Sequence, residues 1–435
     1  MDDVDLRGSP QQGLVTATFG FFIGFAGVVL YGPIAPQFGD AMGLSGVLLG
    51  LLVAAPQLSG SLLRIPFGAW TDDVGAKLPF LILLVLSIIG MSGLAVILLW
   101  LYPDGLTYQQ FPLVFLFGCL SGCGIAVFSI GSAQTSYWYP TDRQGTALAI
   151  YAGLGNSSPG VATLIVPVVI TALGITQTYL LWLGLLVVGT LVFAYYAVDP
   201  YYFQLRKQGV DAETAKQRAE TEGQELFPSG NAMESIRNAA RIRRVWALVA
   251  MFFVSFGGFL ALSVWLPSYW IELHGLNIRS AGVVTAITFV LAAALIRVPG
   301  GWISDTVGGE PTAIVSFGAI GCGSILLVWT RDLGTAMAAT FLLAVGMGVA
   351  NAAVFQLVPK YVPEAVGGAS GLVGGLGAFG GFAVPPLLGL FVDIYGIDGY
   401  ATGFVTYLVL GVGGMILASR LYRTVDQQPG TPAVS

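Results

Sequence analysis

Long apolar runs, separated by short polar segments, make up most of the chain. An apolar run of about 20 residues is long enough for an α-helix to cross the hydrocarbon core of a bilayer. Twelve such runs can be marked, at residues 13–37, 45–70, 78–101, 111–137, 145–171, 176–197, 245–270, 280–303, 311–330, 334–358, 367–392 and 399–422. The pattern therefore predicts an all-α integral membrane protein with twelve transmembrane helices.

One long polar segment divides the twelve runs into two sets of six. It covers residues 198–244, between a first half at 1–197 and a second half at 245–435 that ends in a short tail. Its positive and negative charges are mixed, which suggests a solvated linker in which one short helix could lie along the membrane surface. We therefore expect two six-helix halves joined by a cytoplasmic linker.

The composition excludes an ordinary soluble protein. Only 9% of the 435 residues are charged, whereas soluble domains carry about 25%. The N-terminal stretch MDDVDLRGSP is acidic and the first apolar run is too long for a cleavable signal peptide. The chain is expected to be a multi-pass protein of the cell membrane, a monomer in contact with the lipid bilayer, and without a nucleic-acid partner.

The sequence offers little for catalysis or metal binding. His274 is the only histidine and falls in a polar segment between two runs. No Ser-His-Asp set, P-loop or dinucleotide-binding glycine motif stands where such motifs need to be. The cysteines Cys119, Cys123 and Cys322 all lie inside apolar runs, where small packing residues are usual. We expect no enzyme, no metal site and no cofactor.

The basic residues predict how the chain crosses the membrane. If the N-terminus is cytoplasmic, fourteen of the eighteen Lys and Arg residues fall in inside segments and only Arg279 and Arg331 fall outside. Basic residues concentrate on the cytoplasmic side of membrane proteins. Both termini are therefore expected in the cytoplasm.

The two halves resemble one another in sequence. RIPFGAWTDDVGAK at 64–77 aligns without gaps to RVPGGWISDTVGGE at 297–310, an offset of 233 residues. GTALAIYAGLGN at 145–156 aligns to GGASGLVGGLGA at 367–378, an offset of 222. The eleven-residue difference fits an extra outer loop, YPDGLTYQQFP, in the first half. Internal duplication of this kind is typical of secondary transporters, whose substrate site lies between the repeats.

Two arginines, Arg64 and Arg297, lie well inside apolar runs at equivalent places in the repeat. A charged side chain near the centre of a transmembrane helix costs about 2.5–3.5 kcal/mol on insertion scales. No Asp or Glu lies deep in any of the twelve runs to pair with them. A small anion from solution would suit the planar guanidinium forks. The alternative is that both arginines cap backbone carbonyls in a kink near Pro66 and Pro299.

These features resemble the major facilitator superfamily and, within it, the nitrate/nitrite porter family. GAWTDDVGAK and GWISDTVGGE resemble the superfamily's Gly-x-x-x-Asp loops, although most of the basic residues of that motif are missing. The porter family has one arginine in the second and one in the eighth span, matching Arg64 and Arg297. It also has a Gly-x-Gly-Asn helix in each half, here AGLGN at 152–156 and GGLGA at 374–378, in which Ala378 replaces the asparagine.

The resemblance implies a set of site residues and a function. It assigns substrate binding to the two arginines and Asn156. It assigns conformational change to the Gly-rich helices. The family's aromatic clamp, a set of rings around the substrate, would fall on phenylalanines of the fourth and seventh spans. The residues concerned are Arg64, Arg297, Asn156, Phe128, Phe252 and Phe256 for binding, and Gly153, Gly155, Gly375 and Gly377 for the moving helices.

The expected activity is exchange of nitrate for nitrite by alternating access. An empty cavity with two guanidinium groups holds about two positive charges, so the carrier should change sides more readily when an anion is bound. Proton-coupled nitrate symport and transport of another small oxyanion remain open, as does an anion sensor that does not transport.

Overall fold

The computed structural model describes residues 6–228, 232–362 and 366–426. Within these ranges every regular element is helical, and twelve helical segments are long and apolar enough to cross a membrane. The predicted all-α architecture with twelve spans is confirmed.

The first six spans lie between Pro10 and Tyr196, and several consist of two consecutive helices. They are α1 (Pro10–Phe25) with α2 (Ala35–Met42), α3 (Gly46–Leu62) with α4 (Arg64–Val74), α5 (Lys77–Leu101), α6 (Phe111–Ser121) with α7 (Val127–Trp138), α8 (Thr141–Asn156) with α9 (Ser158–Leu173), and α10 (Ile175–Tyr196).

The last six spans begin at Arg243, and several again consist of consecutive helices, although the tenth span is the single helix α19. They are α14 (Arg243–Phe252) with α15 (Gly258–His274), α16 (Ile278–Thr285) with α17 (Leu291–Val307), α18 (Gly309–Trp329), α19 (Leu333–Tyr361), α20 (Val366–Ala378) with α21 (Gly380–Tyr395) and α22 (Gly399–Thr402), and α23 (Val405–Asp426). Single π-helical turns at Phe253–Gly257 and Ala286–Val290 connect α14 to α15 and α16 to α17.

Two breaks inside the spans follow from prolines in the sequence, and one of them recurs at the equivalent place in the other half. Helix α3 ends at Leu62, where Pro66 cannot donate an N–H to the carbonyl four residues earlier. Helix α8 ends at Asn156, three residues before Pro159, and α20 ends at Ala378. Asn156 and Ala378 are 222 residues apart, the offset of the second sequence repeat. The internal duplication is therefore visible in the backbone.

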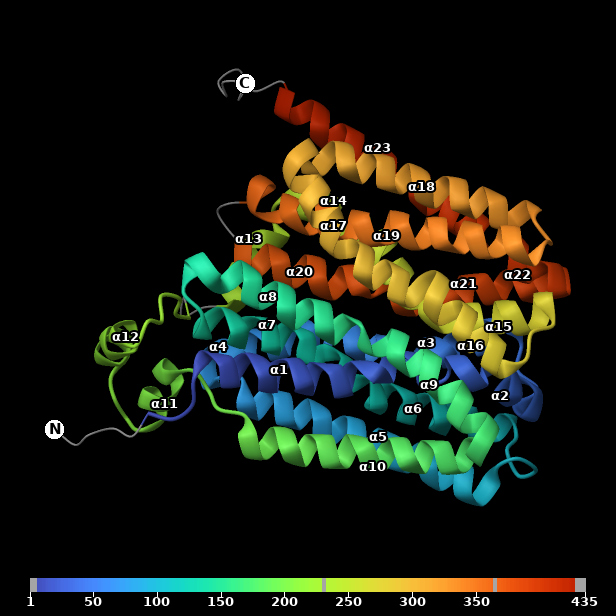
Figure 1. Cartoon of the computed structure of the whole chain (residues 1–435), viewed down its shortest axis with the longest axis horizontal. Helices are drawn as coiled ribbons and strands as arrows, with labels where there is room; N and C mark the ends of the chain where they lie inside the picture. The colour runs from blue at the N-terminus through green and yellow to red at the C-terminus, as the bar shows by residue number, and fades with distance from the viewer. Residues whose placement is uncertain (1–5, 229–231, 363–365, 427–435) are drawn as a thin grey trace.

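The spans lie roughly side by side, with the first half (blue to green) against the second (yellow to red) (Figure 1). The first turns of α1, the last turns of α23 and the helices between the halves all lie at one end of the bundle, on the left of Figure 1. We call this the linker end, and the opposite end, which carries α2 and α22, the far end. The two candidate arginines lie in spans that run between these ends.

The halves pack most closely near the far end, where α3 lies along α21 and α9 along α16. A Cβ on Gly46 or Gly389 would collide with the backbone of the other residue, so the two chains touch there without side chains between them. The Asp393 carboxylate of α21 accepts hydrogen bonds from the backbone N–H groups of Gly46 and Val47, the latter at 2.9 Å. An acidic side chain of the second half thus caps the first turn of a helix in the first half.

The described part of the linker contains three short helices, where the sequence suggested room for one. They are α11 (Tyr201–Lys207), α12 (Ala212–Thr221) and α13 (Ala232–Ala240). Polar segments of this length form helices where caps and packing support them, as Asp211 does by accepting a hydrogen bond from Thr214 N–H at 3.0 Å.

The linker helices are attached to different halves. In α11, the Tyr201 hydroxyl donates to Gly8 O at 3.0 Å and the Gln204 amide donates to Arg7 O at 2.7 Å. Helix α13 packs on α20 and also contacts α4, and its Ser235 hydroxyl accepts a hydrogen bond from Gly368 N–H at 3.1 Å. Helix α11 therefore belongs with the first half, whereas α13 is bound mainly to the second.

Candidate anion-binding site

Arg64 begins α4 at the break in the second span, near the middle of the bundle. The Ser129 hydroxyl of α7 donates to the Arg64 carbonyl oxygen at 2.9 Å, which satisfies a backbone group at the break. The backbone of this arginine is therefore held at the break, and its side chain extends to α20 of the second half.

The Arg64 guanidinium is buried and only partly hydrogen-bonded. The residue is 3% exposed; its Nε donates to Gly60 O at 3.0 Å and its Nη1 donates to Gly374 O of α20 at 3.3 Å. Its Nη2 is buried without a hydrogen-bond partner among the described residues. The alternative role, capping backbone carbonyls, thus applies to the Nε and Nη1 groups of Arg64, whereas the Nη2 group remains without a partner among the described residues. A buried donor without a partner is costly, so this group is suited to a ligand.

Aromatic rings lie on the Arg64 guanidinium from both halves. Its Cζ is 5.1 Å from the centre of the Phe128 ring and 5.3 Å from the centre of the Phe256 ring. Phe252 does not contact the guanidinium in this way but stacks on Phe256, with ring centres 5.2 Å apart. Two of the three predicted clamp residues therefore lie against an arginine, and the third supports one of them.

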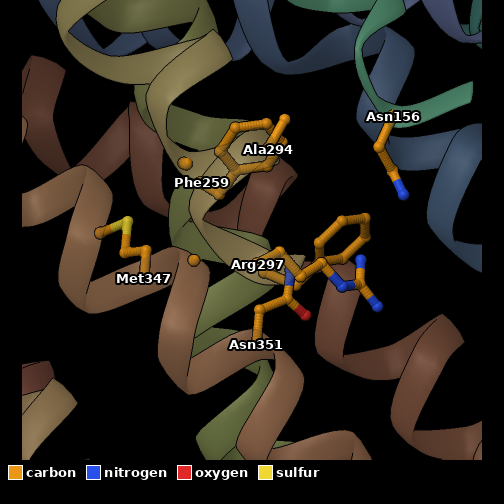
Figure 2. A pocket seen from close by; sticks show the side chains of 9 residues that line it. Asn156, Phe259, Ala294, Arg297, Met347 and Asn351 are labelled. Carbon is orange, nitrogen blue, oxygen red and sulfur yellow. The ribbon is translucent and has the colours of Figure 1, made fainter. Parts of the chain in front are cut away.

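Arg297 lies on α17 and lines a small, partly open cavity, in which the centre of a water-sized sphere can occupy a volume of ≈ 10 Å³ (Figure 2). Its side chain is partly exposed, unlike that of Arg64, and it makes no hydrogen bond or ion pair within the described part of the chain. The cavity is lined by Asn156, Phe256, Phe259, Ala293, Ala294, Arg297, Met347, Gly348 and Asn351. Because Phe256 lines this cavity and also lies against Arg64, the surroundings of the two arginines share one ring.

Asn156 reaches the same cavity from the first half, at the last residue of α8. Its Nδ2 donates to Ala152 O at 2.7 Å, whereas its Oδ1 is buried without a partner among the described residues. Predicted site residues of both halves, Asn156 from the first and Phe256 and Arg297 from the second, therefore line the same cavity. The resemblance-based assignment of Arg297, Asn156 and Phe256 to one site is compatible with this geometry.

The predicted glycines of the moving helices differ in their surroundings. Gly155 lies so close to Phe21 that a side chain would collide with the ring, and a Cβ on Gly375 would lie 2.8 Å from Ile65. A Cβ on Gly377 would lie 2.7 Å from Phe252, whereas one on Gly153 would meet open space. The close approach expected at Gly153 is therefore absent here, because α8 has no neighbour on that side.

Six of the nine lining residues were not among the predicted site residues, and three of these six have side chains larger than a methyl group. Phe259 follows Phe256 by about one helical turn, so the spacing of the other aromatic positions could have indicated it. Asn351, an amide inside an apolar run, was a usable signal of the same kind as Asn156. Met347 carries no signal that separates it from ordinary packing.

The acidic groups near the spans are engaged elsewhere. Toward the linker end, Asp72 accepts a hydrogen bond from the Tyr137 hydroxyl at 2.6 Å. Also there, Glu310 accepts hydrogen bonds from Lys360 and Tyr361, at 2.6 and 2.7 Å. Within the described ranges neither candidate arginine is paired with a carboxylate, so the site has cationic donors to offer an anion.

Two repeated six-helix halves, enclosing a small cavity with cationic donors, define a membrane transporter and not an enzyme. A family model of the Major Facilitator Superfamily matches residues 17–385, and the chain belongs to that superfamily. The D-xylose-proton symporter has the same fold, with a TM-score of 0.73 at 15% identity over 96% of this chain and 98% of that one.

Curated relatives match the chain along nearly all of its length. NarK1 of Thermus thermophilus, a probable nitrate/nitrite antiporter, is 29% identical over 95% of this chain and 92% of that protein. The nitrite extrusion protein of Bacillus subtilis is 29% identical over 92% of this chain and 91% of that protein. A probable nitrate/nitrite transporter of Mycobacterium tuberculosis, NarK2, is 28% identical over 89% and 90%.

Proposed function

We propose that the protein exchanges nitrate for nitrite across the cytoplasmic membrane by alternating access. The observation that carries this proposal is the unsatisfied cationic donor set. Arg64 keeps one buried nitrogen without a partner, and Arg297 faces a small cavity without forming an ion pair within the described residues. The names of the relatives, which match the chain almost end to end, supply the identity of the anion.

The shape and polarity of the site suit a small, flat, weakly hydrated anion. Nitrate and nitrite are planar, with their charge on oxygens at the edge and with faces that are less polar. A guanidinium fork can bind two such oxygens side by side. The rings of Phe256 and Phe259 in the same cavity provide apolar surface for the faces of the anion.

The charge of the site favours exchange over net uptake. Two guanidinium groups hold about two positive charges, because arginine stays protonated in proteins. A bound monovalent anion removes one of them, which lowers the cost of enclosing the cavity in a low-dielectric surrounding. The loaded carrier should therefore change sides faster than the empty one.

The linker end of the bundle is assigned to the cytoplasm. Fourteen of the eighteen basic residues fall in segments on this side when both termini are inside, which agrees with the usual bias of basic residues. The far end, which carries α2 and α22, then faces the outside.

The test is counterflow by the purified protein in liposomes. Vesicles loaded with nitrite, nitrate, phosphate, chloride or no permeant anion are diluted into labelled nitrate, with and without an imposed pH gradient. We expect nitrate entry that requires internal nitrite or nitrate and does not follow the pH gradient. Protein-free vesicles and vesicles with Arg297→Gln serve as controls.

Each alternative gives a different result in this experiment. Nitrate entry into anion-free vesicles, driven by an inward proton gradient, would establish symport and overturn exchange. Counterflow with phosphate but not nitrite would identify a carrier of another oxyanion. Specific nitrate binding without any flux would identify a sensor.

A further inference from the structure

Asn351 is a buried amide whose hydrogen bonds the fold does not use. It lies on α19 and is 5% exposed, and its Oδ1 has no partner among the described residues. Its side chain lines the same cavity as Arg297 and Asn156 (Figure 2). Leaving a buried polar atom unpaired costs about 1–3 kcal/mol, and among the unpaired buried atoms Asn351 Oδ1 belongs to a residue that lines the cavity of Arg297.

The internal repeat shows what Asn351 replaces. GCGIAV at 122–127 aligns to GMGVAN at 346–351, so Asn351 corresponds to the apolar Val127 of the first half. Asn156 in turn corresponds to the apolar Ala378 of the second half. Each half therefore contributes one amide to the cavity, but from a different helix: α8 in the first half and α19 in the second.

We propose that Asn351 binds the third oxygen of nitrate and is the residue that distinguishes nitrate from nitrite. This inference rests on the proposed function. The Arg297 fork can hold two oxygens of either anion. Nitrate carries a third oxygen on the opposite side of its nitrogen, whereas nitrite has only a lone pair there, one bond length further from any partner.

The Asn351 side chain can supply the donor that this oxygen needs. An amide group carries an N–H donor and a carbonyl acceptor, and a half-turn about the last side-chain bond exchanges their positions. The Oδ1 of Asn351 has no partner among the described residues, so such a turn breaks no hydrogen bond at that atom. The Asn156 amide is less free, because its nitrogen already donates to Ala152 O.

The test measures the affinities of nitrate and nitrite for purified full-length protein by calorimetry and by anion-induced thermal stabilisation. A hydrogen bond to a charged group is worth about 1.5–3 kcal/mol. In Asn351→Ala we expect nitrate to bind about tenfold more weakly or worse and nitrite to change by less than about threefold. Asn351→Asp should lose both anions, because its carboxylate would occupy the Arg297 fork.

A matched control is Thr340→Ala, which removes a buried hydroxyl from the same helix that donates to Ala336 O at 2.7 Å. It should leave both affinities unchanged. Anion-free Asn351→Ala should melt at the wild-type temperature or above, because the substitution removes an unpaired polar atom. A lower melting temperature with unchanged affinities would make Asn351 a structural residue and overturn the inference.

The remaining outcomes separate this inference from the proposed function. Equal losses of nitrate and nitrite affinity in Asn351→Ala would also overturn it, while leaving the exchange proposal intact. If wild-type protein binds neither anion, the proposed function fails and the assignment of Asn351 falls with it.

Discussion

The two arginines, although equivalent in the repeat, are held in different ways. Arg64 is bound to carbonyls of both halves, Gly60 O and Gly374 O, and lies between two aromatic rings. Arg297 lines a cavity and has no hydrogen bond within the described ranges. Arg64 therefore contributes to the structure as well as to the charge of the site, whereas Arg297 is available to the anion alone.

Lysine substitutions should separate these roles. Lysine keeps the charge but loses the planar fork, so Arg64→Lys and Arg297→Lys should each weaken nitrate binding about tenfold or more. Only Arg64→Lys should also lower the melting temperature of anion-free protein, because only Arg64 bonds to backbone carbonyls. Calorimetry gives the nitrate affinity and thermal unfolding gives the melting temperature of the same preparations. Near-normal exchange by either variant would show that the arginine concerned is not part of the binding site.

Truncation of Phe256 should affect affinity and selectivity together. The ring lies against Arg64 and lines the cavity of Arg297, and a cation–π contact is worth about 0.5–2 kcal/mol. In Phe256→Ala we expect nitrate affinity to fall about 2- to 30-fold and discrimination against chloride to weaken. Phe317→Ala, a buried phenylalanine on α18 that does not line the cavity, is the control. If Phe256→Ala and Phe317→Ala change nitrate affinity and selectivity equally, Phe256 is an ordinary packing residue and not part of the binding site.

At the scale of elements, helix α3 and helix α21 are the closest contact between the halves. The contact involves backbone against backbone at Gly46 and Gly389, and a Cβ on Gly50 would also meet the backbone of Pro385. Such a contact leaves no room for a side chain. Any conformation that opens the far end must separate these helices, so their glycines determine how stable the closed form is.

Gly389→Leu should therefore hold the far end open. Overpacking typically costs about 1–3 kcal/mol, and a cost in the closed state alone shifts the populations by roughly 5- to 150-fold. We expect nitrate binding to remain measurable and exchange to fall by a similar factor, because turnover needs both states. Gly413→Leu on α23, where a Cβ would meet open space, should exchange normally. Parallel loss of binding and exchange in Gly389→Leu would show that the fold itself is damaged.

The sequence predicted the elements better than it predicted the site. Apolar run length determines where helices can cross a bilayer, so the twelve spans could be marked without a structure. The charge of Arg64 and Arg297 made them conspicuous in apolar runs, but nothing in the sequence said that Arg64 would bond to Gly374, 310 residues away. Asn351 was missed because the repeat places its amide on a different helix from Asn156, and only the packing of α17 on α19 brings it to Arg297.

At the scale of the whole molecule, the two halves contact each other differently at the two ends of the bundle. The far end has backbone contacts and the Asp393 cap on the first turn of α3. The linker end has α13, which contacts α20 and α4. Because Asp393 belongs to the second half and the N–H groups it accepts from belong to the first, this cap exists only while the far end is closed.

Asp393→Ala should shift the protein toward the form with an open far end. Loss of a helix cap costs about 1 kcal/mol, which corresponds to roughly a fivefold change in population. Spin labels on the far ends of α3 and α21 should report a larger fraction of long distances in this variant. Asp211→Ala, which removes the cap of α12 in the linker, is the control and should leave the distances unchanged. Identical distributions in wild type and Asp393→Ala would show that the cap does not contribute to closure.

The linker helices are attached to opposite halves, so the short chain segment between them limits how far those attachments can separate. On the first-half side the Phe227 ring packs on Tyr202, with ring centres 5.5 Å apart, and on the second-half side α13 begins at Ala232. Only residues 228–231 lie between these two attachments. The five residue steps from Phe227 to Ala232 reach at most about 17–18 Å, so these two attachment points can lie no further apart than that unless Phe227 or α13 detaches. At the linker end the separation of the halves is thus limited by covalent length, whereas at the far end their close contact depends on glycines that leave no room for side chains.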